Sequence, residues 1–113
     1  DLGKQISLPD EKKIDKNKVN GCASQVWLDM GWKEPNNIKS FNIEGDSDAL
    51  IVKGLIAILL SLYQGKTLAQ VQAVDPRLEF EKLGLNSHLS SQRSNGLKSM
   101  IDQIKIFVNT IEN

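Results

Sequence analysis

Cysteine and histidine are almost absent from this 113-residue sequence, which contains one of each, Cys22 and His88. A single cysteine cannot form an internal disulfide, so the disulfide framework of a small secreted domain is excluded. One cysteine and one histidine in a monomer also cannot supply the ligands of a structural zinc site or an iron–sulfur cluster. We therefore expect no metal site in this chain. A Ser/His/Asp triad is formally possible, but the sequence contains no G-x-S-x-G nucleophile motif.

The sequence also lacks an excess of charge of either sign. It has 14 Lys and Arg residues and 14 Asp and Glu residues, which give a formal net charge of zero. Its two arginines are Arg77 and Arg93. A neutral chain with so few guanidinium groups is not typical of a nucleic-acid-binding protein, nor of one that binds anionic membranes.

Long apolar runs are missing as well. The longest, Gly54–Tyr63, is interrupted by Ser61, and a transmembrane helix needs about 20 apolar residues. No signal peptide is recognisable. With 40% hydrophobic and 25% charged residues, the composition is that of a globular domain. The length fits one domain, and we expect residues 1–113 to form it.

The first half of the sequence predicts strands. Residues 25–30 alternate between apolar and polar side chains, which is the period of a half-buried strand. Residues 40–44 alternate in the same way, and the turn-forming residues 31–37 predict that the two strands pair as an antiparallel hairpin. Residues 17–20 are a candidate third strand at the edge of the sheet.

The second half predicts helices. Residues 49–63 are apolar on nearly all sides, which indicates a central, buried helix with Ser47 as its N-cap and Gly65 as its stop. Two short helices are expected next, the first beginning at the capping box of Thr67 and Gln70.

The second short helix is expected to begin at Asp75-Pro76 and to end at Gly84. Ser90 is the expected N-cap of a last helix, whose apolar stripe consists of Leu97, Met100, Ile101, Ile104, Val108 and Ile111. Strands followed by helices predict an α+β fold, in which a small antiparallel sheet of about three strands packs against helices.

Cys22 is the first candidate for chemistry. Most lone cysteines are buried and act as small hydrophobic side chains. Here Asn20-Gly21 predicts a turn immediately before Cys22, and the small neighbours Ala23 and Ser24 would leave the sulfur approachable. A cysteine in a loop on a rigid scaffold is a typical position for a functional residue.

Other polar residues have simpler interpretations. His88 precedes the last helix and is more often a helix-entrance residue than a catalytic group. Arg93 lies in the first turn of that helix, where its charge opposes the helix dipole, which favours a use outside the helix. Asp46 and Asp48 are explained as capping residues. Lys53 would extend its ammonium group from an apolar helix into water.

Three sequence blocks, in order over residues 19–101, resemble the SufE/CsdE family of sulfur acceptors. They are GCASQVW at 21–27, GDSDALIVKGL at 45–55 and LGLNSHLSSQRSNGL at 83–97. The resemblance implies a fold like that of the cluster scaffold IscU, which agrees with the α+β layers expected from periodicity. The family's N-terminal helix is expected to be missing, since this sequence begins at Asp1. Two positions depart from the family pattern. Ser91 occupies a position where the family often has proline, and Phe80 is a single aromatic residue where the family commonly has a pair.

The resemblance implies that Cys22 accepts sulfane sulfur as a persulfide from a PLP-dependent, SufS- or CsdA-like cysteine desulfurase. The chain would stimulate the desulfurase and deliver sulfur to an iron–sulfur scaffold complex in the cytoplasm, or in an organelle if the source carries plastids. It would hold no cofactor itself, because PLP belongs to the partner, and it would be a carrier rather than an independent enzyme. A role in docking or loop support is implied for Gly21, Ser24, Asp46, Asp48, Lys53, His88 and Arg93.

A persulfide is easily oxidised or reduced, so the carrier should shelter it, and Val26, Leu28 and the central helix could line the shelter. Three alternatives stay open. The chain could be a CsdE-like acceptor that feeds another sulfur pathway, such as tRNA modification. It could be a one-cysteine thiol oxidoreductase, although it lacks a resolving cysteine. It could also be a non-catalytic docking module in which Cys22 is inert and buried.

Overall fold

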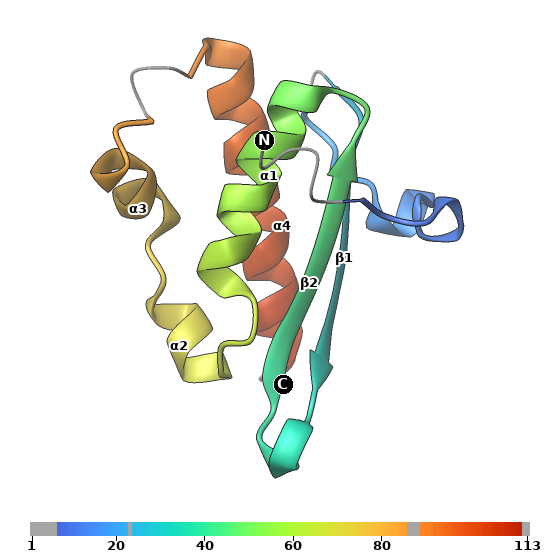
Figure 1. The fold of residues 1–113 in the computed structure, drawn as a ribbon, viewed down its shortest axis with the longest axis vertical. Helices are drawn as coiled ribbons and strands as arrows, with labels where there is room; N and C mark the ends of the chain where they lie inside the picture. The colour runs from blue at the N-terminus through green and yellow to red at the C-terminus, as the bar shows by residue number, and fades with distance from the viewer. Residues whose placement is uncertain (1–6, 23, 86–88, 112–113) are drawn as a thin grey trace.

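The computed structural model describes residues 7–22, 24–85 and 89–111. An antiparallel hairpin is followed by helices that lie on one side of it (Figure 1). The strands are β1 (Val26–Lys33) and β2 (Ser40–Ser47), and the helices are α1 (Leu50–Tyr63), α2 (Leu68–Ala73), α3 (Pro76–Lys82) and α4 (Ser91–Ile111). This arrangement confirms the predicted α+β class.

The hairpin is longer than predicted and the third strand is shorter. β1 pairs with β2 along its whole length, from Val26 opposite Ser47 to Lys33 opposite Ser40. In the described part of the chain, the expected edge strand is a single bridge between Lys18 and Trp27. A 3-10 turn, η3 (Asp15–Asn17), ends just before the bridge, and a turn at Asn20 and Gly21 follows it, so few residues are left to pair.

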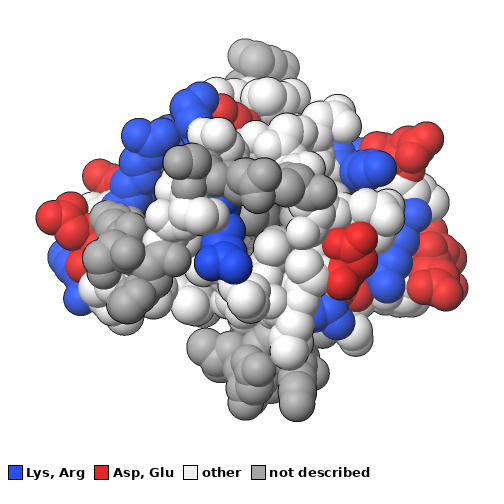
Figure 2. Space-filling view, turned by 90° about the horizontal axis from the view of Figure 1, so that it is seen from above, with Lys and Arg blue, Asp and Glu red and all other residues white. Residues whose placement is uncertain are grey.

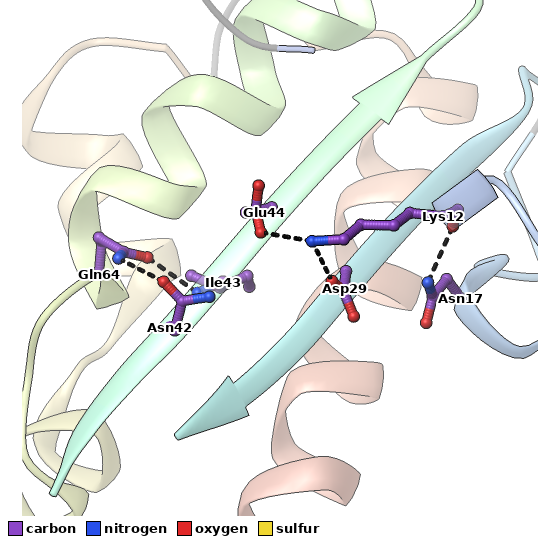
Figure 3. Close-up of polar contacts among 7 residues, drawn as sticks. All are labelled: Lys12, Asn17, Asp29, Asn42, Ile43, Glu44 and Gln64. Atoms are coloured by element: carbon purple, nitrogen blue, oxygen red, sulfur yellow. Dashed lines mark hydrogen bonds and ion pairs between the residues drawn. The ribbon is translucent and has the colours of Figure 1, made fainter. Parts of the chain in front are cut away.

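A lysine stabilises an unfavourable pair on the hairpin. Asp29 and Glu44 lie directly opposite each other, and like charges in that position destabilise a sheet. The ammonium group of Lys12 lies between them, 3.2 Å from Asp29 Oδ2 and 3.1 Å from Glu44 Oε1 (Figure 3). Lys12 belongs to the 3-10 turn η2 (Asp10–Lys12), so the contact also attaches this N-terminal segment to the strands.

Local signals explain where the later helices begin. Thr67 and Gln70 form the predicted capping box at α2, and the Asp75 side chain accepts the amide hydrogen of Leu78 at α3. The Ser90 hydroxyl accepts the amide hydrogen of Arg93 at α4. Each cap satisfies an amide that has no partner within its helix, and these predictions are confirmed.

The start of α1 was predicted wrongly. The helix begins at Leu50, and its N-cap is Ala49, which has no side chain that could cap it. Ser47 is instead the last residue of β2, and its hydroxyl accepts the amide hydrogen of Ala49 at 3.2 Å. The strand continues three residues past the predicted end at residue 44, and this extension moves Ser47 out of the capping position.

The helix α1 is also less buried than its composition predicts. Ile56, Leu59 and Tyr63 are buried against the core, whereas Leu50 and Ile51 are 49% and 60% exposed. An apolar pattern shows which faces can be buried, but not whether another element covers each of them. Two large apolar side chains therefore lie uncovered at the start of α1.

The core lies between the hairpin and the helices. It contains Val26 and Leu28 from β1, Phe41 and Ile43 from β2, and five residues of the predicted α4 stripe, namely Leu97, Met100, Ile101, Ile104 and Val108. Gln64, at the end of α1, fastens the helix to β2, since its side chain accepts the amide hydrogen of Ile43 and donates to Asn42 (Figure 3). Within the described residues, no helix is long and apolar enough to cross a membrane.

Candidate functional site

A cavity of about 410 Å³ opens beside Cys22 at one end of the molecule. The first turns of α1 and α4 meet the start of β1 at this end (Figure 1). In the view onto this end, charged side chains lie mostly around the margins, and uncharged ones cover much of the middle (Figure 2). The cavity is therefore a mainly apolar space next to the single thiol of the sequence.

Glycine fixes the shape of the loop that carries Cys22. Gly21 has a φ of +90°, a conformation that side chains with a Cβ adopt only under strain. A Cβ atom added there would also lie 2.5 Å from the hydroxyl oxygen of Ser99 on α4. Gly21 thus gives the loop both its turn and its close approach to α4.

The Cys22 thiol points to the backbone of α4. Its Sγ donates to the carbonyl oxygen of Gly96 at 3.7 Å, and the residue is half-buried. Burial raises the pKa of the Cys22 thiol above its usual value. Because only the thiolate is a strong nucleophile, the sulfur in this conformation is held in its less reactive form at neutral pH.

Asp48 holds the end of the Cys22 loop. Its Oδ1 accepts the backbone amide hydrogen of Gln25 at 3.0 Å, and its Oδ2 accepts from the Gln25 side chain at 3.4 Å. Gln25 directly precedes β1. The interpretation of Asp48 as a helix cap is therefore wrong, because its carboxylate is bound to the loop rather than to the first turn of α1.

Asp46 is a buried carboxylate with several partners. It is 2% exposed and accepts the amide hydrogens of Leu8 at 3.0 Å and Ser47 at 2.8 Å. The ammonium groups of Lys13 and Lys53 lie 3.3 and 3.2 Å from its oxygens. Burial favours a higher pKa for Asp46, but these hydrogen bonds and cations outweigh it and hold the pKa below its usual value.

Asp46 therefore does not cap a helix, contrary to the simple interpretation of the sequence. Its contacts join the N-terminal segment, the end of β2 and α1. The ammonium group of Lys53 is bound to this carboxylate rather than free in water. Lys13 also lies 5.5 Å from the centre of the Trp27 ring, which adds a cation–π contact to the same network.

The structure places the implied site residues in three groups. Cys22, Ser24 and Arg93 line the cavity, and Gly21 and Asp48 shape the loop. Asp46 and Lys53 form the ionic network beside them, and His88 lies outside the described residues. No group of three or more Cys, His, Asp or Glu side chains suited to a metal ion occurs among the residues that the structure describes.

The sequence identified only part of the cavity wall, because the central helix was expected to line it and α4 was not. Its apolar part comes from two helices and consists mainly of Leu50, Ile51, Val52, Leu55, Gly96 and Met100. The central helix thus lines the cavity as expected, whereas Val26 and Leu28 belong to the core. The available signal was the run of apolar residues at the start of α1, which exceeds what one buried helix face needs.

Comparison with known proteins gives consistent matches. The sequence model of a family described as "SufE: Fe-S metabolism associated domain" matches residues 1–108. A SufE-like protein of Rhizobium etli is 51% identical over 108 residues, which are 93% of this chain and 72% of the relative. A SufE-like protein of Rhizobium meliloti is 45% identical over 106 residues, covering 93% of this chain and 76% of the relative.

A third relative carries a functional name. The sulfur acceptor protein CsdE of Escherichia coli is 42% identical over 104 residues, which are 91% of this chain and 69% of that protein. A family match over nearly the full sequence and three relatives above 40% identity agree with the blocks around Cys22, Asp48 and Arg93. On this evidence the chain belongs to the SufE family.

Proposed function

We propose that this protein is a sulfur acceptor that carries sulfane sulfur as a persulfide on Cys22. The observation that carries the proposal is the position of the single thiol of a SufE-family chain at the wall of a mainly apolar cavity. The name of the CsdE relative, a sulfur acceptor protein, supports it. The partner we propose is a PLP-dependent cysteine desulfurase, and the destination of the sulfur is iron–sulfur cluster assembly in the cytoplasm.

The proposed transfer is a thiol–disulfide type of exchange. The Cys22 thiolate attacks the terminal sulfur of a persulfide on the desulfurase. A new S–S bond forms at Cys22, the S–S bond of the donor breaks, and the donor cysteine leaves as a thiolate. No external oxidant or reductant is needed, because one S–S bond replaces another.

The geometry gives the chain two roles in this exchange. The apolar wall from α1 and α4 screens the half-buried sulfur on that side, which protects a persulfide from oxidants and from reduction by other thiols. Burial raises the pKa of Cys22 in the free protein, so the thiolate is scarce at neutral pH until a partner changes its surroundings. The uncovered Leu50 and Ile51 lie on this end of the molecule and provide apolar area for the partner to cover.

Mass spectrometry tests the proposal directly. The chain is mixed with a cysteine desulfurase and L-cysteine, and its intact mass is measured without reductant. The wild type should gain about 32 Da, one sulfur atom, and the matched Cys22→Ser variant should gain nothing, because an alcohol forms no stable adduct with sulfane sulfur. A wild-type chain that gains no sulfur, or a Cys22→Ser variant that gains as much, contradicts the carrier function.

The name of the CsdE relative, a sulfur acceptor protein, is equally compatible with a second destination of the sulfur. In this version the acceptor chemistry is the same, but the sulfur feeds another pathway such as tRNA modification. The two destinations are separated by incubating the sulfur-loaded chain with each class of acceptor. Loss of the added sulfur, about 32 Da per chain, is followed over time by intact mass. The acceptor that removes it faster identifies the pathway.

A further inference from the structure

The contact between Cys22 and α4 is close enough to depend on the chemical state of the sulfur. Cys22 Sγ lies 3.7 Å from the carbonyl oxygen of Gly96. A Cβ atom added at Gly96 would lie 3.5 Å from Sγ and 3.8 Å from the Cys22 Cβ, so the thiol lies close to α4 with room for a methyl group between them. Gly21 rests in the same way on Ser99, one turn further along α4. We call Gly96 and Ser99 the α4 seat of the Cys22 loop.

Within the α4 seat, the group that contacts the sulfur is Gly96, and it offers only a hydrogen-bond acceptor. The polar atom nearest to Sγ in this contact is the carbonyl oxygen of Gly96, at 3.7 Å. A carbonyl oxygen inside a helix has a second lone pair that is free to accept such a bond. A neutral thiol has an S–H that it can donate there, whereas an anionic sulfur has none and is repelled by the partial negative charge of the oxygen.

Loading with sulfur changes Cys22 from a neutral thiol, which can donate a hydrogen bond, to an anionic persulfide, which cannot. A persulfide is a stronger acid than the corresponding thiol, so its terminal sulfur is an anion near neutral pH. The added sulfur also lengthens the side chain by one atom, in a place where the space between Sγ and Gly96 is about that of a methyl group. The cavity beside the seat has room for the longer side chain, and the half-buried Arg93 supplies a positive charge in its wall.

We propose that the α4 seat is selective for the protonated, sulfur-free form of Cys22, so that loading with sulfur releases the Cys22 loop from α4. This inference rests on the proposed carrier function. The positioning residue is Gly96, which acts through its carbonyl oxygen and leaves room beside the sulfur for no side chain larger than a methyl group. The loop then has one position when the carrier is empty and another when it is full, and a partner that binds the loop can distinguish the two.

Amide hydrogen exchange of residues 19–25 tests the release in the intact protein. Exchange is measured before and after loading by a desulfurase with L-cysteine, and loading is verified by intact mass. One weak S–H···O contact corresponds to about two- to fivefold in the opening equilibrium, so exchange of this segment should rise by about that factor on loading. Unchanged exchange in a chain shown to be loaded overturns the inference but leaves the carrier function standing.

A matched pair of variants tests the same idea without any desulfurase. Cys22→Asp introduces an anion that cannot donate, and Cys22→Asn introduces a neutral group of the same size that can. Exchange of residues 19–25 should be about two- to fivefold faster in Cys22→Asp than in Cys22→Asn at neutral pH. This difference in exchange rate between the two variants should disappear at low pH, as the introduced carboxyl group becomes protonated. Equal exchange in the two variants at every pH overturns the inference.

Two substitutions at Gly96 locate the effect on α4. Gly96→Ala adds a methyl group at ordinary contact distance from Cys22, so the seat and the loading-dependent change should persist. Gly96→Val adds further methyl groups toward the sulfur and should speed exchange of the empty loop by about two- to fivefold, leaving no further increase on loading. A Gly96→Val chain that retains the full loading-dependent change contradicts the role of Gly96.

Discussion

The end of β2 and the Cys22 loop are neighbours, since Asp48 binds Gln25, yet they are held very differently. At the end of β2, the Asp46 carboxylate is 2% exposed and has two amide donors and two ammonium groups around it. In the loop, the Cys22 thiol is half-buried and makes one weak hydrogen bond. A rigid scaffold therefore lies directly beside a group that is only weakly held.

The difference follows from what each region has to do. A buried carboxylate is stable only if its hydrogen bonds and charge are satisfied, so any change that removes the partners of Asp46 is costly. A thiol loses little when its weak hydrogen bond is broken, so the Cys22 loop can change position at small cost. The proposed release of the loop on loading needs such a change, and a rigid scaffold beside the loop would keep the change local.

Asp46→Ala should have the largest effect on folding. It leaves the ammonium groups of Lys13 and Lys53 without their partner and removes the acceptor for the buried amide of Leu8. Allowing for the partial exposure of both lysines, we expect a loss of about 2–3 kcal/mol in the free energy of unfolding. Urea denaturation checks this, with Asp10→Ala as control, because Asp10 is fully exposed and also faces Lys13.

The same network predicts a pH dependence. The folded-state pKa of Asp46 is lowered, so its stabilisation is present above the ordinary carboxyl pKa of about 4 and is lost as the pH falls through the folded value. The stability difference between wild type and Asp46→Asn should therefore shrink below about pH 4. A difference that stays constant down to the acid transition would show that the charge of Asp46 does not contribute.

Gly21→Ala should have the next largest effect, and it should be concentrated in the loop. A positive φ costs a residue with a Cβ about 1 kcal/mol, and the clash with Ser99 Oγ adds about as much again. Gly65→Ala is the matched control, since Gly65 has a φ of +78° and open space around it. We expect about 2 kcal/mol of destabilisation at Gly21 and about 1 kcal/mol at Gly65, measured by urea denaturation.

The Gly21→Ala variant should also expose the thiol. Alkylation of Cys22 by iodoacetamide should be faster than in the wild type, because the loop can no longer rest on α4. Adding Ser99→Ala to Gly21→Ala removes the clashing oxygen and should restore part of the protection. If Ser99→Ala changes neither stability nor alkylation in that background, the loop does not rest on Ser99.

The two regions also differ in how far the sequence predicts them. Thr67 with Gln70, Asp75 with Leu78 and Ser90 with Arg93 are caps within three residues of each other, and local patterns predicted all three. The alternation of the two strands and the apolar stripe of α4 were also predicted, because these patterns likewise involve residues that are close together in the sequence. The class of the fold follows from these local periods and from their order along the chain.

Long-range contacts were not predicted. Asp46 binds an amide 38 residues away, and Cys22 binds a carbonyl 74 residues away. No periodicity links such positions, so Asp46 was assigned to a cap and Gly96 was not considered as a contact of the thiol. The family blocks implied docking or loop-support roles for Asp48 and Arg93, but only the structure shows that Asp48 binds Gln25 and that the Cys22 thiol contacts Gly96.

Asp48→Ala should lower the free energy of unfolding by less than Asp46→Ala and Gly21→Ala do. Its carboxylate is exposed, and it accepts the amide hydrogen of Gln25 at the end of the loop. We expect a loss of about 0.5–1 kcal/mol and faster hydrogen exchange of the Gln25 amide. Asp48→Asn keeps an acceptor oxygen and should retain most of the protection. Equal exchange of Gln25 in Asp48→Ala and the wild type would show that this bond does not hold the loop.

Ile51→Ser should have the smallest effect on stability and an effect on the partner. Ile51 is 60% exposed at the cavity, so its replacement should change the free energy of unfolding by no more than about 0.5 kcal/mol. If the desulfurase covers this surface, the loss of apolar area should raise the concentration needed for half-maximal stimulation by about tenfold.

Ile38→Ser is the matched control, because Ile38 is 58% exposed and follows η4 (Pro35–Asn37) in the hairpin turn, at the far end of the molecule (Figure 1). Steady-state cysteine turnover at varied concentrations of each variant separates the two sites. Equal stimulation by both variants would place the partner's contact elsewhere, and a loss with Ile38→Ser alone would place it at the hairpin turn.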